Sequence, residues 1–232
     1  MSYPGPYDDQ FYAARRERTL PSAKRILAIV REHVAFKSVA DFGCGTGTWL
    51  SMALDLGAET AIGFEGEWMR REWLDDPRIE LRSHDLEEPA TLGPVDLAIS
   101  LEVAEHVSVG RAESFISELC GAAPLVLFGA AIPGQGGVGH VNEQWQSYWA
   151  DLFEGNGYHC FDAIRPLVWN EKELPYWYRQ NVFLYSKVPL DAPRPAILNL
   201  VHPAKWDEER SVRLSSRLRH AAKWKLRRML SR

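Results

Sequence analysis

Runs of apolar residues alternate along the chain with segments in which apolar side chains recur at helical spacing. The apolar runs predict five strands, at 38–42, 60–65, 79–85, 95–100 and 123–130. Helices are predicted between them, at 48–57, 68–74 and 111–120. Strands that alternate with helices in this way are typical of a parallel sheet covered on both faces.

The pattern changes after Pro133. A helix is predicted at 144–157, and the two apolar segments after it, 158–165 and 181–187, suit a hairpin that closes one edge of the sheet. The proline-rich stretch 189–197 then interrupts regular structure.

The start of the chain predicts a different kind of segment. Thr19 and Pro21 suit the cap and first turn of a helix. The aromatic residues before it, Tyr7, Phe11 and Tyr12, suit a segment that closes as a lid over a substrate or, equally, ordinary packing. The four expected segments are a lid or cap at 1–21, the main domain at 22–188, a linker at 189–210 and a basic tail at 211–232.

Composition favours one soluble globular domain. The chain has 232 residues, of which 46% are apolar and 25% charged. Its three cysteines lie far apart, which indicates neither a disulfide framework nor a thiolate zinc site. We expect no signal peptide and no apolar run long enough to cross a bilayer. These features predict a cytoplasmic protein, and nothing in them indicates an oligomeric state.

The net charge of −4 is unevenly distributed. Residues 1–210 hold 19 basic and 31 acidic side chains, whereas 211–232 hold eight basic and no acidic ones. An acidic body disfavours a nucleic-acid partner, because phosphate neutralisation needs basic side chains on the binding face. Leucines at helical intervals in the tail suit a helix on an anionic membrane surface, here the inner face, or on an acidic partner. A basic end without fixed structure is the alternative.

A glycine-rich turn follows the first predicted strand. In "VADFGCGTG" the glycines Gly43, Gly45 and Gly47 lie at the carboxyl end of that strand, where open parallel sheets bind ligands. The spacing is GxGxG and differs from a dinucleotide fingerprint, whose third glycine would replace Thr48. Asp41, which leads the turn, suits a cationic ligand group better than a pyrophosphate.

The segment "DFGCGTG" resembles motif I of the class I S-adenosylmethionine-dependent methyltransferases, and the order of elements from 22 to 187 is similar to that family throughout. The resemblance implies an α/β fold: a Rossmann-like sandwich whose seven-stranded, mostly parallel sheet has helices on both faces and an antiparallel last strand. It also implies that S-adenosylmethionine is the cofactor.

The resemblance assigns cofactor contacts residue by residue. It implies that Asp41, Gly43 and Gly45 contact the methionine part, that Glu65 binds the ribose hydroxyls, and that Asp85 and Leu86 hold the adenine. A carboxylate can accept two hydrogen bonds from a vicinal diol, which agrees with the role of Glu65. For Asp85, capping of a helix is an alternative. The full set of expected contacts is Asp41, Gly43, Cys44, Gly45, Gly47, Glu65, Asp85, Leu86 and Ser100.

The segment "SLEVAEHV" follows the fourth predicted strand. In a helical turn, Glu102, Glu105 and His106 would fall at i, i+3 and i+4 and project from one face. Such a group suits a divalent cation, although a solvated or capping turn explains two acids as well. After the fifth strand, a glycine-rich loop brings His140 to the same edge of the sheet.

The combination of "ExxEH" with a later histidine is similar to metal-dependent 2′-O-methyltransferases of small RNAs, and "EVAEH" resembles the O-methyltransferases of ubiquinone synthesis. The resemblance implies that Glu102, Glu105, His106 and His140 hold Mg²⁺ or Mn²⁺. The expected catalytic residues are Glu105, His106 and His140, of which either histidine could act as a general base without metal.

The sequence therefore predicts an S-adenosylmethionine-dependent O-methyltransferase. A saccharide or similar polyol hydroxyl is the first expected acceptor, because "FGAAIPGQGGVGHVNEQW" resembles bacterial methyltransferases of sugar pathways. The aromatic side chains at 169–178 suit stacking against sugar rings or flat substrates or, equally, core packing. A phenolic or other small metabolite is the second acceptor and small RNA the third. A nicotinamide oxidoreductase and a non-catalytic cofactor-binding module are the alternatives from other classes.

Overall fold

A computed structural model of the chain describes residues 9–90 and 92–206. It divides into two compact units, Met1–Leu200 and Val201–Arg232. In the second unit the described part is 201–206, of which 203–206 is helical. The predicted basic tail lies outside the described residues, so the prediction for it stays untested.

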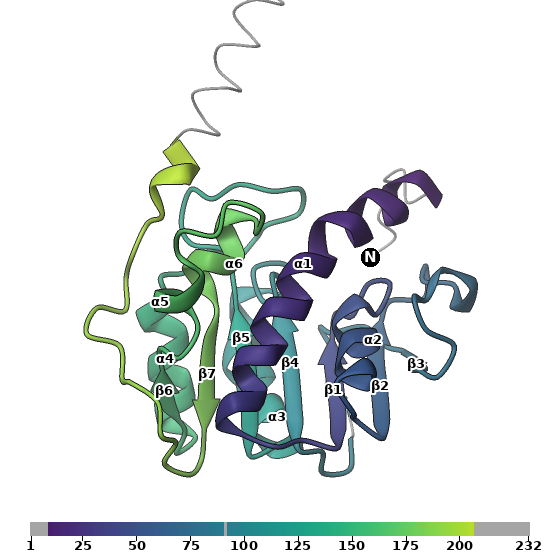
Figure 1. Ribbon diagram of the computed structural model, residues 1–232, viewed down its shortest axis with the longest axis horizontal. Coiled ribbons are helices and arrows are strands. Elements are labelled where there is room, and N and C mark those ends of the chain that lie inside the picture. The colour runs from purple at the N-terminus through teal and green to yellow at the C-terminus, as the bar shows by residue number, and fades with distance from the viewer. Residues whose placement is uncertain (1–8, 91, 207–232) are drawn as a thin grey trace, which may run out of the picture. The chain divides into compact units, whose positions relative to one another are not determined.

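The first unit is built on one mixed β-sheet (Figure 1). Within the described residues its strands are β1 (Ser38–Phe42), β2 (Thr60–Glu65), β3 (Glu80–Ser83), β4 (Leu97–Leu101), β5 (Leu125–Gly129), β6 (His159–Phe161) and β7 (Phe183–Ser186). Their order is β3-β2-β1-β4-β5-β7-β6, and β7 pairs antiparallel with both neighbours. This confirms the predicted seven-stranded, mostly parallel sheet. The two strands expected as a closing hairpin do pair antiparallel at one edge, but two helices lie between them in the chain, so they are not a hairpin.

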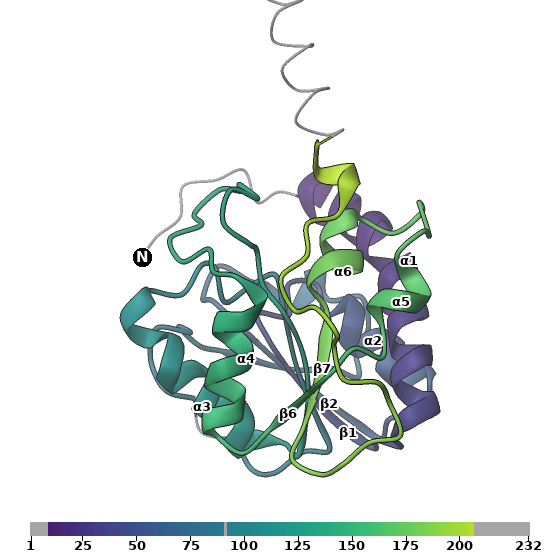
Figure 2. The same cartoon turned by 90° about the vertical axis from the view of Figure 1, so that its left-hand side faces the viewer.

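Helices cover both faces of the sheet. They are α1 (Asp9–His33), α2 (Thr48–Asp55), α3 (Ala112–Ala122), α4 (Gln146–Gly155), α5 (Arg165–Val168) and α6 (Tyr176–Asn181), with 3₁₀ turns η1 (Arg71–Trp73) and η2 (Val109–Arg111). Figure 2 shows α3 and α4 on one side of the sheet and α1, α2, α5 and α6 on the other. The helix predicted at 68–74 shortens to η1, and α5 and α6 were not predicted.

Successive residues of the central strands pack into opposite layers of the core. In β4, Leu97 and Ile99 join the cluster formed with α1 and α2, whereas Ala98 joins the cluster formed with α3 and α4. In β5, Leu127 joins the first of these clusters and Phe128 joins the second. Because both faces are buried, these strands are apolar throughout, which is why the sequence marks them clearly.

The first helix does not begin where the sequence predicts. It starts by Asp9 and continues through Pro21, although a proline ring cannot donate the backbone hydrogen bond of a helix interior. Tertiary contacts hold the turns before the proline: Arg16 pairs with Asp75 at 3.3 Å, and Arg18 lies over the ring of Trp177. The prediction that this helix starts at Thr19 and Pro21 is therefore wrong.

The predicted linker also differs from the structure. Residues 189–200 lack regular structure, but they belong to the first unit and pack along it. The buried guanidinium of Arg165 donates to the carbonyls of Ile197 at 2.7 Å and Leu198 at 2.9 Å. These contacts make 189–200 part of the domain.

Among the described helices, none combines the length and apolar character needed to cross a membrane.

Candidate active site

The glycine turn between β1 and α2 is held tightly against β2. The N–H groups of Gly43 and Cys44 both donate to the carbonyl of Phe64, at 2.9 and 3.1 Å. Gly43, Gly45 and Gly47 have φ values of 86°, 53° and 75°, a region that side chains disfavour. The turn therefore exposes backbone at the carboxyl end of β1, and α2 begins directly after it.

A pocket lies over this turn. Four expected cofactor contacts line it, namely Asp41, Gly43, Cys44 and Gly45, together with Thr19, Thr46, Thr48, Trp49, Leu101 and Tyr178. The sequence analysis did not assign Thr46 or Thr48 to the site, although both stand beside the expected contact Gly47 in the chain. It also did not assign Thr19, Trp49 or Leu101. Thr19 comes from α1 and Tyr178 from α6, so the pocket wall joins distant parts of the chain.

Asp41 and Cys44 are buried titratable groups of the pocket lining. Asp41 is 2% exposed and comes from the centre of the sheet, where it pairs in register with Gly63 and Ile99. Burial, and then the carboxylates of Asp41 and Glu65, raise the pKa of the Cys44 thiol well above its ordinary value. Cys44 is therefore a neutral thiol at pH 7, and the local charge comes from carboxylates.

Glu65, at the end of β2, braces the glycine turn. One of its carboxylate oxygens accepts the N–H of Gly45 at 2.8 Å and the other accepts the N–H of Gly66 at 3.0 Å. The side chain is half-buried. Each oxygen keeps a second lone pair, so the carboxylate can still accept hydrogen bonds from a ligand.

The expected adenine contacts lie beyond β3 and do not line the pocket. Asp85 is exposed, and its Oδ1 accepts the N–H of Glu87 at 3.1 Å, so it caps a turn instead of a helix. Leu86 is half-buried against the core on the α3 side. Ser100, in β4, is fully buried, and its Oγ has no hydrogen-bond partner among the described residues.

The segment after β4 is an irregular turn, so the helical turn that would place the three side chains on one face does not form. Glu102 has a φ of 57°, in the left-handed region, so the turn is not α-helical at this residue. Its carboxylate accepts hydrogen bonds from the amides of Gln135 at 2.6 Å and Asn181 at 3.0 Å. Glu102 therefore ties β4 to the loop after β5 and to the end of α6, and the expected four-residue ligand set loses one member.

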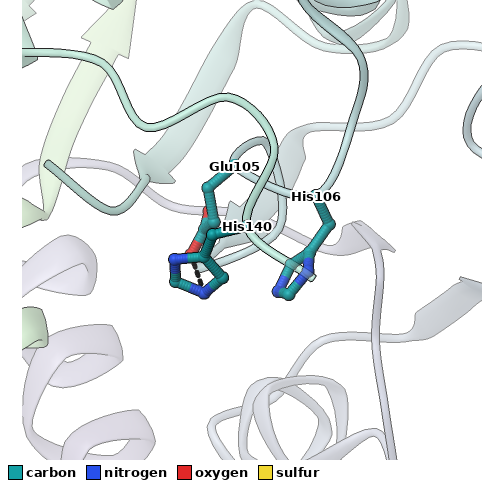
Figure 3. Close-up of side chains that lie close together, drawn as sticks. All are labelled: Glu105, His106 and His140. Atoms are coloured by element: carbon teal, nitrogen blue, oxygen red, sulfur yellow. Dashed lines mark ion pairs between the residues drawn. The ribbon is translucent and has the colours of Figure 1, made fainter. Parts of the chain in front are cut away.

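The other three expected ligands do come together. Glu105, His106 and His140 each offer one donor atom, and these atoms lie within 4.8 Å of one another. Figure 3 shows the three side chains pointing to the same side, with His140 beside Glu105. His140 Nε2 is 3.9 Å from Glu105 Oε1, and the two imidazole centroids are 4.8 Å apart. Backbone hydrogen bonds from Val141 and Asn142 to the Glu105 carbonyl fix the approach of the loop.

Glu105 is the unusual member of this cluster. It is fully buried, and neither carboxylate oxygen has a hydrogen-bond partner among the described residues. Burial, followed by the Glu102 carboxylate, raises the pKa of Glu105 well above its ordinary value. Because an unpaired buried carboxylate is costly, the site favours a cation or a proton beside it.

The cluster fits a divalent metal ion in its chemistry. A carboxylate oxygen and two imidazole nitrogens are donors that Mn²⁺ and Co²⁺ accept readily, whereas Mg²⁺ prefers oxygen ligands. His106 is exposed and His140 is half-buried, so the open side of the cluster faces solvent. A substrate can therefore reach an ion held by Glu105, His106 and His140.

The cluster lies next to the glycine turn. An ideal Cβ built on Gly43 would stand 2.5 Å from Cγ2 of Val103, the residue two before Glu105. Val103 therefore packs directly on the turn. The pocket and the cluster are neighbouring parts of one edge of the sheet, at the carboxyl ends of β1 and β4.

Comparison with known proteins identifies the fold. No protein-family model and no curated protein sequence matches the chain. Among solved structures, a chain of the complex between the Haloferax volcanii Trm112 methyltransferase activator and the putative methyltransferase aligns with a TM-score of 0.57 and 13% identity, over 83% of this chain and 100% of that one.

Two further solved structures, both of methyltransferases, align with this chain. Magnesium protoporphyrin IX methyltransferase (ChlM) from Synechocystis PCC 6803 with bound SAH aligns at a TM-score of 0.54 and 14% identity, over 81% of this chain and 90% of its own. The chain has the class I methyltransferase fold. The methyltransferase domain of bacterial CtHen1 also shares this fold, at a TM-score of 0.52 and 19% identity, over 73% and 98% of the two chains.

Proposed function

We propose that this chain is an S-adenosylmethionine-dependent O-methyltransferase that uses a divalent cation held by Glu105, His106 and His140. The observation that carries the proposal is the buried, unpaired carboxylate of Glu105 with two imidazole nitrogens within 4.8 Å. This cluster stands beside the glycine turn of a class I methyltransferase fold. The sequence analysis expected these three residues together with Glu102 as ligands, whereas the Glu102 carboxylate accepts hydrogen bonds from Gln135 and Asn181.

The pocket over the glycine turn is the proposed cofactor site. Gly43 and Gly45 let the backbone approach a ligand closely, and the buried Asp41 carboxylate suits the cationic amino group of a methionine moiety. Glu65 stands one strand away with free lone pairs for the ribose hydroxyls. The roles proposed for Asp85, Leu86 and Ser100 rest on the sequence resemblance alone.

Methyl transfer from a sulfonium needs alignment, exclusion of water and removal of one proton. The acceptor oxygen forms a bond to the methyl carbon while the C–S bond breaks with its electron pair on sulfur, which yields S-adenosylhomocysteine. A bound divalent ion supplies Lewis acidity that lowers the pKa of the acceptor hydroxyl. Without a bound ion, His106 or His140 is the nearby group that could accept the released proton.

A divalent ion held by Glu105, His106 and His140 would still accept ligands from a substrate. An acceptor with two adjacent oxygens would supply such ligands, so we propose a vicinal diol as the acceptor group. A saccharide or similar polyol meets that requirement. However, Tyr176 and Tyr178 are buried, so neither offers a free face for a sugar ring.

A second acceptor class is favoured by the surface beside the cluster. Val138, Val141 and Trp145 flank His140 in the chain and are 81%, 63% and 41% exposed. Exposed apolar side chains on a site loop favour a substrate with a flat or apolar body. A phenolic acceptor with neighbouring oxygens, such as a catechol, combines that body with the diol.

The test compares methyl transfer to a panel of sugars, polyols and catechols with and without a chelator. We expect turnover with at least one vicinal diol, its loss in EDTA, and its return with Mn²⁺. Calorimetry with S-adenosylhomocysteine should give the same affinity in both buffers, because the cofactor does not need the cation. Full turnover in EDTA would remove the metal from the proposal, and binding of NAD instead of S-adenosylhomocysteine would overturn it.

A matched pair of variants separates the cluster from general effects of charge. Glu105→Ala is expected to lower turnover at least 100-fold while cofactor affinity changes less than twofold. Glu113→Ala removes an exposed acid on α3 and should leave both unchanged. Equal losses in the two variants would contradict a specific role for Glu105.

A further inference from the structure

Glu143, in the loop after β5, contacts His140 but is not itself one of the three clustered residues. Glu143 Oε1 lies 2.9 Å from His140 Nδ1. The same oxygen accepts the N–H of Gly136 at 2.7 Å, and the other oxygen accepts the N–H of Gly134 at 2.7 Å. One carboxylate thus holds both the imidazole and the backbone of the loop that carries it.

This arrangement determines which nitrogen of His140 carries a proton. An ionised carboxylate accepts hydrogen bonds and cannot donate one. Both oxygens of Glu143 accept backbone N–H groups, and Oε1 also faces His140 Nδ1 at 2.9 Å. In that contact Nδ1 is the hydrogen-bond donor, so it is the protonated nitrogen.

In the neutral imidazole with this tautomer, the other nitrogen has a free lone pair. His140 Nε2 is directed at Glu105 Oε1, 3.9 Å away, across a gap too long for a hydrogen bond. A lone pair and a carboxylate that face each other at this distance suit a shared cation between them. In metal sites, a carboxylate on the remote N–H of a ligating histidine fixes the tautomer and raises the basicity of the ligand.

We propose that Glu143 is a positioning residue for His140: it fixes the Nδ1–H tautomer and directs Nε2 into the cluster with Glu105 and His106. The metal part of this inference rests on the proposed function, whereas the tautomer does not. Glu143 also ties the imidazole to Gly134 and Gly136, so the loop and the ligand are placed together.

The first experiment reads the tautomer directly, without metal or substrate. Long-range ¹H–¹⁵N NMR spectra at pH 8.5 of the chain labelled with ¹⁵N-histidine are expected to show a proton on Nδ1 of His140 and none on Nε2. In Glu143→Gln, the distribution should move toward the Nε2–H tautomer. A proton on Nε2 of the native protein, in that tautomer or in an imidazolium, would overturn the proposal.

The second experiment measures Mn²⁺ binding by the loss of the free-ion EPR signal. Glu143→Gln is expected to weaken binding 10- to 100-fold, as for other acids that orient a ligating histidine, with S-adenosylhomocysteine affinity unchanged. Glu154→Gln alters an exposed acid of α4 with no described contact to the cluster and should have no effect. If the native chain does not bind Mn²⁺, the proposed function fails and the tautomer experiment alone decides on Glu143.

A double-variant cycle separates positioning from simple support of the loop. In His140→Ala, the further change Glu143→Gln should cost no additional Mn²⁺ affinity, because Glu143 acts through the imidazole. An equal loss in both backgrounds would show that Glu143 only stabilises the glycine loop, and would overturn the role proposed for it.

Discussion

Val103 occupies the space that a side chain on Gly43 would need: an ideal Cβ there would stand 2.5 Å from Val103 Cγ2. The glycine turn that follows β1 and the acidic turn that follows β4 are therefore in direct contact. This contact explains how a cofactor pocket and an ion cluster can share one edge of the sheet. It also shows that Gly43 is required by packing as well as by its φ of 86°.

Gly43→Ala is expected to weaken binding of S-adenosylhomocysteine. The new methyl group would meet Val103, and alanine at this φ is strained by about 1–3 kcal/mol. Calorimetry and thermal unfolding measure the two effects. Val103→Ala added to Gly43→Ala removes the clash and leaves the strain, so it should recover part of the affinity. No recovery would mean that the backbone strain alone is responsible.

Glu65→Ala is expected to weaken cofactor binding by about 1–3 kcal/mol, because the carboxylate both braces Gly45 and offers acceptors to a ribose. Glu59→Ala, an exposed acid paired with Lys37, serves as the control and should not change affinity. Calorimetric titration with S-adenosylhomocysteine decides the matter. Native affinity in a folded Glu65→Ala variant would remove this residue from the cofactor site.

The sheet and the glycine turn could be predicted because their signals are local. Both faces of β1, β4 and β5 are buried, so each appears as an apolar run. The glycines of the turn adopt positive φ values that other residues disfavour, so their GxGxG spacing marks the turn in the sequence.

What the sequence missed depends on contacts between distant segments. The spacing of Glu102, Glu105 and His106 suits a common face only in a helix, and the left-handed φ of Glu102 turns its carboxylate toward Gln135 and Asn181. Pro21 marks a helix start by local rules, yet tertiary contacts on the preceding turns keep the helix continuous. In both cases partners far along the chain outweigh the local pattern.

Mn²⁺ is expected to raise the thermal stability of the native chain. An ion that binds only the folded state stabilises it by about 2.7 kcal/mol at 100 times its Kd. Glu105→Ala should lose this stabilisation, whereas Glu113→Ala should retain it. Unfolding scans across a Mn²⁺ titration provide the measurement. The same shift in Glu105→Ala as in the native chain would place the ion elsewhere.

The basic tail is predicted to serve association and not catalysis. A chain that ends at Trp206 keeps residues 189–200, whose contacts with Arg165 belong to the domain. It should retain cofactor affinity but lose salt-sensitive binding to anionic liposomes. Replacing the eight basic residues of 211–232 by glutamine in the full-length chain should have the same effect. Binding that survives these replacements would exclude charge as its cause.

Gly137→Ala tests the placement of His140 without changing any charge. A Cβ on Gly137 would stand 2.1 Å from His140 Nε2, so the imidazole must leave its position beside Glu105. We expect Mn²⁺ affinity and turnover to fall at least tenfold, while S-adenosylhomocysteine binds as before. Gly155→Ala is the matched control, since a Cβ there meets nothing within 4 Å. If Gly137→Ala binds Mn²⁺ normally, His140 is not a ligand in this arrangement, and the cation would have to be held by Glu105 and His106 alone.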